Sequence, residues 1–256
     1  MTPAVPRFLE LQAPPNWATA EFISDLHLRA AEPETFEAWR RYMQGTQAGA
    51  VFILGDLFDV WVGDDAAHEP GFAGDCAAVL RAAAALRPVF FMRGNRDFLV
   101  GPALMQSCGV TLLDDPTVLG FAGQRWLLTH GDALCLDDTQ YMRFREQVRA
   151  LPWQQAFLAK PLAERKAIAR GMREQSEARK GGKDAYGDLD TAGVLAWLEE
   201  ADAKVMIHGH THRPAEHALP AGRERVVMSD WDAAAAPPRM QVLRLAASGL
   251  QRVALA

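Results

Sequence analysis

Short apolar runs alternate with helical patterns along most of this 256-residue chain. The runs are rich in β-branched and aromatic residues and are predicted to be strands; they cover residues 19–24, 50–54, 89–92, 125–129 and 205–207. Between them, apolar residues at helical spacing lie within 33–43, 71–86 and 188–200. This alternation predicts an α/β fold. The chain after Arg223 indicates further short strands with a turn at Ser248-Gly249, and therefore a second sheet.

Polar clusters follow five of the predicted strands, at residues 24–27, 55–59, 94–97, 130–132 and 208–212. In open α/β sheets, ligands bind outside the carboxyl ends of the strands, so we expect the clusters to converge. Their donors are carboxylates, one amide and imidazoles, with no thiolate: Asp25, His27, Asp56, Asn95, His130, His210 and His212. This mixture favours Mn, Fe, Zn or Mg over copper or an iron–sulfur cluster.

Each cluster alone has a simpler interpretation, because a buried histidine is more often a satisfied core residue than a ligand. Five clusters in order, each after a strand, favour two divalent cations. Asp56 follows a buried run and can bridge both ions. His208 is interpreted as a strand end, and the cysteines as inert.

Composition and charge exclude several classes of protein. The formal net charge of −5 argues against a nucleic-acid partner, because such proteins carry an excess of Lys and Arg. Three cysteines without a CxxC pair indicate a reducing compartment. No apolar run is long enough for a transmembrane helix, and residues 1–18 lack the features of a secretory signal. We interpret these residues as a mobile tail and expect a cytosolic protein.

Residues 137–183 differ from the rest, with helical spacing throughout and no strand signal. Residues 140–185 hold eleven basic and five acidic side chains, a net charge of +6, against −11 for the remainder. The segment is either an ordinary helical hairpin with solvated charge or a basic cap for an anionic partner. Its apolar residues Trp153, Phe157, Leu162 and Met172 could either wall acyl chains or pack the cap against itself.

The ordered motifs DLH, GDLFD, GNRDF, HGD and GHTH resemble those of the calcineurin-like metallophosphoesterase superfamily. The longer stretches ILGDLFDVWVGDD, GNRDFLVG and HGHTHRP resemble the UDP-2,3-diacylglucosamine pyrophosphatase family of lipid A biosynthesis. The resemblance covers about residues 19–230. It implies a sandwich of two mixed β-sheets flanked by helices. The catalytic domain would span 19–136 and 184–256, with the helical cap inserted at 137–183.

The resemblance also implies a site. One metal, usually manganese in this family, would be held by Asp25, His27, Asp56 and His212, and the other by Asp56, Asn95, His130 and His210. The catalytic residues would be Asp56, Asn95, Arg96 and His130. Substrate contacts would fall on Asn95, Arg96, Asp138, Tyr141, Ser176, Lys180, Lys183 and His210. The family commonly has Asn where this chain has Lys180.

The implied reaction converts UDP-2,3-diacylglucosamine into UMP and 2,3-diacylglucosamine 1-phosphate (lipid X). The implied location is the cytoplasmic face of the inner membrane, as a peripheral protein, and we expect a monomer. Two cations could activate a shared hydroxide for in-line attack on the α-phosphorus. Arg96 offers phosphate oxygens a planar fork.

The residue type at position 96 also helps to distinguish between possible substrates. Most relatives in the superfamily have His at this position, which can protonate an alkoxide leaving group; Arg cannot give up a proton near neutral pH. A phosphate monoester leaves without acid help, so Arg96 favours a pyrophosphate substrate. The alternatives are another dinuclear metallophosphoesterase, acting on nucleotide or phosphoprotein substrates, and a scaffold that has lost its metals.

Overall fold

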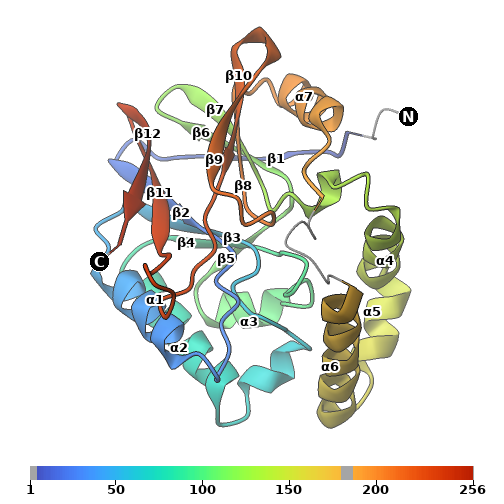
Figure 1. Cartoon of the computed structure of the whole chain (residues 1–256). Coiled ribbons are helices and arrows are strands. Elements are labelled where there is room, and N and C mark those ends of the chain that lie inside the picture. Colours follow the sequence, from blue (N-terminus) through green and yellow to red (C-terminus); the bar gives the residue numbers. More distant parts are fainter. Residues whose placement is uncertain (1–4, 180–186, 256) are drawn as a thin grey trace.

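Two six-stranded mixed β-sheets form the centre of the molecule (Figure 1). The computed structural model describes residues 5–179 and 187–255. For residues 174–179 it describes the backbone but not the side chains. The first sheet has the order β1-β6-β7-β8-β10-β9 and consists of Leu9–Gln12, Thr117–Phe121, Gln124–Thr129, Val205–His208, Arg223–Val227 and Ala215–Leu219. The second has the order β12-β11-β2-β3-β4-β5 and consists of Gly249–Ala254, Gln241–Ala246, Thr19–Ile23, Ala50–Leu54, Val89–Met92 and Thr111–Leu113. The predicted sandwich of two mixed sheets is confirmed.

Strand β3 shows why the apolar runs become central strands. It pairs in parallel with β2 and β4, and all five of its residues are buried. Phe52 and Leu54 face the core between the two sheets, whereas Val51 and Ile53 face the opposite side. Because side chains alternate across a strand, a strand buried on both faces needs an unbroken apolar run.

Helices cover the outer faces of both sheets. The helices α1 (Pro33–Gly45), α2 (Phe72–Ala84) and α3 (Pro102–Ser107) supply Trp39, Leu80 and Met105 to the core cluster that includes the outer face of the second sheet. Helix α7 (Thr191–Glu200) packs Trp197 and Leu198 on the outer face of the first. The result is a four-layer α/β/β/α arrangement that holds the strand ends in fixed positions.

Part of the predicted N-terminal tail belongs to the fold. Strand β1 (Leu9–Gln12) pairs in parallel with β6 at the edge of the first sheet. Phe8 contacts Trp197 with ring centroids 6.4 Å apart. Three of the four β1 residues are exposed, so the sequence shows no apolar alternation there. The prediction of a mobile tail is therefore wrong for this segment.

The described part of the 137–183 segment is helical, as expected, and forms α4 (Thr139–Arg149), α5 (Leu151–Leu158) and α6 (Leu162–Arg179). These helices lie together at one side of the sheets (Figure 1). Arg165 of α6 is 3% exposed and donates to the backbone oxygens of Val62 and Lys160 and to the Asp65 carboxylate. Within the described chain, no helix combines the length and apolar character needed to cross a membrane.

Arg165→Met tests the attachment of α6. The variant leaves two backbone carbonyl oxygens and a carboxylate without their donor, so we expect it to lower the free energy of unfolding by about 1–3 kcal/mol. Lys166→Met is the matched control. Lys166 lies on the same helix and forms an exposed ion pair with Glu69, and the loss of this pair should lower the free energy of unfolding by less than about 1 kcal/mol. Urea denaturation of both variants measures the difference; equal effects would contradict the assignment.

Candidate metal centre

The carboxyl ends of five strands bring the polar clusters together. Asp25, Asp56 and Asn95 follow β2, β3 and β4 of one sheet, and His130 and His210 follow β7 and β8 of the other. The loops are joined by backbone hydrogen bonds: Asp25 N donates to Gly55 O at 3.1 Å. The structure therefore gathers side chains that lie almost 190 residues apart in sequence.

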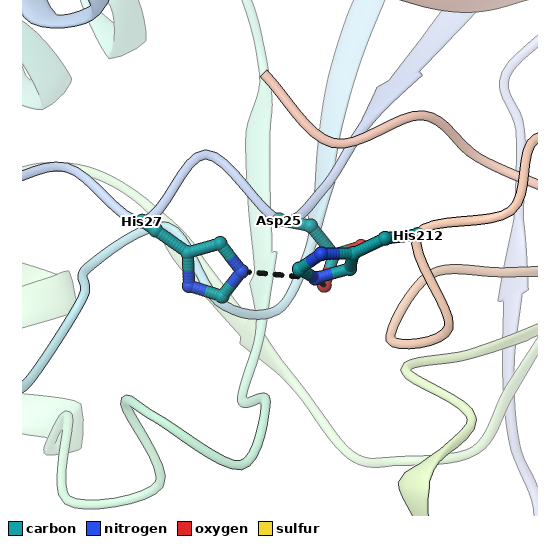
Figure 2. A group of neighbouring side chains, drawn as sticks. All are labelled: Asp25, His27 and His212. Atoms are coloured by element: carbon teal, nitrogen blue, oxygen red, sulfur yellow. Dashed lines mark hydrogen bonds and ion pairs between the residues drawn. The ribbon is translucent and has the colours of Figure 1, made fainter. Parts of the chain in front are cut away.

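Asp25, His27 and His212 form the first group of candidate ligands (Figure 2). The Nε2 atoms of His27 and His212 are 3.0 Å apart, and His212 Nε2 is 3.4 Å from Asp25 Oδ1. The other ring nitrogen of His27, Nδ1, is buried without a hydrogen-bond partner and lies 3.9 Å from Asp56 Oδ2. Imidazole nitrogens and carboxylate oxygens that face one another this closely are a fitting donor set for a divalent cation.

Asp25, Asp56 and His130 form the second group, and all three are buried. Asn95 Oδ1 lies 2.9 Å from His130 Nε2 and 2.7 Å from His210 Nδ1. Asp25 belongs to both groups. Asp56 faces both as well, because its Oδ2 lies 3.9 Å from His27 Nδ1 and its Oδ1 lies 3.7 Å from His130 Nε2. All seven predicted ligands lie in this one site.

Hydrogen bonds to the rest of the protein orient these side chains. His130 Nδ1 lies 2.9 Å from Leu54 O; a hydrogen bond donated there leaves Nε2 free to face Asp56. Asp25 accepts hydrogen bonds from Ser24 Oγ at 2.5 Å and from the backbone of His210 at 2.9 Å. Such contacts hold ligands in one orientation and are typical of metal sites.

The electrostatics of the centre call for positive charge. Burial, reinforced by the charge of Asp25, raises the pKa of Asp56. Burial acts to lower the pKa of His130, but the charges of Asp56 and Asp25 outweigh it and raise that pKa to about 9. Burial, followed by the charge of His130, lowers the pKa of His210 to about 3, so this ring is neutral and able to ligate. Divalent cations would offset the two buried carboxylates.

The backbone at the centre is strained. Five candidate ligands adopt left-handed conformations with φ between 47° and 67°, namely Asp25, His27, Asp56, His210 and His212. This region costs ordinary residues roughly 1–2 kcal/mol each and is concentrated at functional sites. These residues follow β2, β3 and β8, where the chain turns just after each strand ends.

Two glycines of the motifs have a role that the sequence analysis did not assign. A β-carbon at Gly94 would overlap Asp56 Oδ1, and one at Gly209 would overlap Asp25 Oδ2. These glycines therefore admit the carboxylates that neighbouring loops carry. Asp97, in the same motif as Gly94, was also missed: its buried carboxylate accepts from the backbones of Leu57 at 2.8 Å and Gly94 at 2.7 Å, and so joins two ligand loops.

Arg96 lies beside the candidate ligands without being one. Its backbone N–H donates to Asp56 Oδ1 at 2.8 Å. Its side chain is half-buried; burial is the main cause that lowers the pKa of His27, and the positive charge of Arg96 adds to it, whereas the same charge opposes the rise in the pKa of Asp56. This position is suitable for contact with phosphate oxygens.

Of the predicted substrate contacts on the cap, the structure describes the side chains of only two. Tyr141 donates through its hydroxyl to Asp132 at 2.6 Å, and its ring lies 6.0 Å from that of His210. Asp138 is exposed and caps α4 by accepting from Tyr141 N at 2.9 Å. The side chains of Ser176, Lys180 and Lys183 lie outside those that the structure describes.

The apolar residues of the cap mostly pack inward. Phe157 is 6% exposed and belongs to the main core, with Trp153 stacked on it at 5.0 Å and Leu162 packed against the same cluster. The structure therefore favours packing over the alternative that these three residues wall acyl chains. His208 ends β8, as interpreted, and the three cysteines are buried. Burial raises the pKa of the Cys135 thiol to about 12, in agreement with an inert residue.

Gly94→Ala tests the close packing of the ligand loops. The added methyl group would displace Asp56, so we expect divalent metal affinity to fall by about 10–100-fold. Gly45→Ala is the control, because a β-carbon at Gly45 meets nothing within 4 Å. Metal titration of both purified variants provides the measurement. Wild-type affinity in Gly94→Ala would contradict the geometry described here.

Comparison with known proteins agrees with this geometry. Residues 22–214 match the family model described as calcineurin-like phosphoesterase. An archaeal phosphodiesterase of known structure covers 93% of this chain at 12% identity and a TM-score of 0.44, a similarity too weak to add to the assignment.

Curated relatives are more similar. The UDP-2,3-diacylglucosamine hydrolase of Bordetella pertussis is 44% identical, over 89% of this chain and 92% of the relative. Those of Chromobacterium violaceum and Xanthomonas axonopodis pv. citri are 48% and 45% identical, over 82% and 83% of this chain and 89% and 91% of the relatives. The chain thus belongs to the calcineurin-like phosphoesterases and, within them, to the UDP-2,3-diacylglucosamine hydrolase family.

Proposed function

We propose that this protein hydrolyses the pyrophosphate bond of UDP-2,3-diacylglucosamine, giving UMP and 2,3-diacylglucosamine 1-phosphate. The observation that carries the proposal is the gathering of four imidazoles and one amide around two buried carboxylates, in a chain related to hydrolases of that name. Arg96 lies beside the candidate ligands but is not one of them. Its positively charged guanidinium can therefore bind the diphosphate.

We propose two divalent cations, most readily Mn²⁺, as the cofactors. Asp25, His27, Asp56 and His212 would hold one, and Asp56, Asn95, His130 and His210 the other. When bound, such ions acidify water towards neutral pH and offset charge on phosphate oxygens. Hard oxygen ligands with imidazoles and no thiolate suit this choice.

The chain's own residues would position the substrate. Arg96 would bind oxygens of the α-phosphate in a bidentate manner and stabilise the charge that builds on them. UMP and a sugar phosphate separate without a protonated side chain, because a phosphate monoester with a second pKa near 6 is a stable leaving group. Contacts from Asp138, Tyr141, Ser176, Lys180 and Lys183 remain predictions.

We propose that the protein acts as a monomer at the cytoplasmic face of the inner membrane, through its cap. Helices α4 and α5 carry Phe144, Leu151 and Leu158 with 38%, 65% and 41% of their surfaces exposed. Basic side chains of the same segment could rest on anionic headgroups, each contributing about 1 kcal/mol close to the surface. Together these features support peripheral binding to the membrane that contains the substrate.

Arg96→Ala tests the role of the arginine. We expect kcat to fall by about 10²–10³-fold, because a donor to the developing charge is lost, while bound metal per chain stays at the wild-type level. Arg96→Lys should recover only part of the rate, since an ammonium cannot replace a bidentate fork. Steady-state kinetics and metal analysis of the same preparations decide the matter; loss of metal from Arg96→Ala would show that the residue supports the ligands instead.

Isotope labelling tests the reaction itself. Hydrolysis of UDP-2,3-diacylglucosamine in water enriched in ¹⁸O should place the label in UMP, because attack is proposed at the phosphorus nearer the uridine. Mass spectrometry of both products gives the answer. Label in the lipid phosphate would identify the other phosphorus as the one attacked, and absence of turnover with metal supplied would contradict the proposed substrate.

A further inference from the structure

Helix α4 lies next to the metal centre but buries little apolar surface. Val148 is its one buried residue. Burial of one side chain contributes about 1.5–3 kcal/mol and does not define the rotation of a helix. The position of α4 therefore depends on polar contacts.

Most of these contacts meet at Asp132, whose side chain is completely buried. Its Oδ2 accepts hydrogen bonds from Tyr141 Oη at 2.6 Å, Arg145 Nε at 2.8 Å and Arg149 Nη2 at 3.3 Å. All three donors lie on α4, whereas Asp132 follows strand β7. One carboxylate of the catalytic sheets thus holds three side chains of the cap.

The same network reaches the loops that carry the candidate ligands. Asp132 is two residues beyond His130. Arg149 Nη2 also donates to the backbone oxygen of Gly94 at 3.0 Å, immediately before Asn95. A shift of α4 would therefore be felt at both loops.

We propose that Asp132 is a positioning residue that fixes helix α4 of the cap against the metal-binding loops and keeps Arg145 and Arg149 beside the centre. The inference rests on the proposed function in taking the substrate to be a diphosphate bound by both the cap and the metals. Two guanidinium groups share one carboxylate here, so a net positive charge remains for an anionic substrate. Both side chains are partly exposed, 21% for Arg145 and 22% for Arg149.

Asp132→Asn in the metal-loaded protein tests the proposal, because it keeps the size of the side chain and removes its charge. A lipid-linked nucleotide contacts cap and metals together, whereas bis(p-nitrophenyl) phosphate is small enough to contact the metals alone. We expect the ratio of kcat/KM values, nucleotide lipid over small diester, to fall about 10–100-fold, since slight misplacement of substrate has effects of this size. An unchanged ratio would overturn the proposal.

Asp137→Asn is the matched control, because it makes the same change at an exposed carboxylate of the same loop. It should leave the ratio at the wild-type value. Arg145→Met removes the Asp132 contact from the cap side and should lower the ratio as well. If the two residues act as one unit, the double variant loses no more than the more affected single variant; additive losses would overturn the proposal.

Hydrogen exchange separates this proposal from the proposed substrate. Asp132→Asn should speed exchange of backbone amides in α4 (Thr139–Arg149) and leave β7 and β8 protected. Unchanged exchange in α4 would overturn the positioning role whatever the substrate. A wild-type protein that cleaves the small diester but not the nucleotide lipid would instead contradict the proposed function.

Discussion

The burial of two carboxylates close together is the constraint on which the rest of the centre depends. Asp25 is inaccessible to solvent and Asp56 is 2% exposed, and both belong to one group with His130. Each buried charge costs several kcal/mol unless it is compensated, and neighbouring like charges add to that cost. Backbone N–H groups compensate part of it, through His210 and Arg96. The imidazoles of His130 and His212 compensate another part, and divalent cations held by the same side chains would add to it.

That charge arrangement requires loops in conformations that the chain would otherwise avoid. Left-handed backbone conformations at the candidate ligands lower the stability of the fold, and so does the extra backbone freedom of Gly94 and Gly209 in the unfolded chain. They persist because each loop begins at a strand that is held from both sides, and β3, buried along its whole length, is the extreme case. The apolar sandwich thus supplies the stability with which the polar centre is held in shape. Loop substitutions at the centre should therefore affect metal binding before they affect the fold.

Sequence reasoning succeeded where one residue type carried the information. Buried strands such as β3 were predictable because an unbroken apolar run has few other uses, and the convergence of the candidate ligands was predictable because they follow those strands. That these residues bind metal stays a prediction. It failed where a role depends on distant partners. Strand β1 is recognisable only beside β6, more than a hundred residues away. Asp97 and Asp132 stand in motifs that were noticed, but their tasks depend on backbone groups of another loop and on side chains of α4.

The excess of basic side chains in the cap is partly paired with carboxylates elsewhere in the chain. The sequence alone left the +6 of residues 140–185 as either solvated charge or a surface for an anionic partner. Five of those basic side chains pair with carboxylates of the catalytic domain: Arg145, Arg149, Arg165, Lys166 and Arg173. Their partners are Asp132, Asp65, Glu69 and Asp59. Much of the positive charge of the cap thus pairs with carboxylates of the catalytic domain. Because the Asp132 pairs lie beside the candidate metal centre, the attachment of the cap and the proposed recognition of a diphosphate draw on the same two arginines, Arg145 and Arg149. A cap that detached would take that positive charge away from the site.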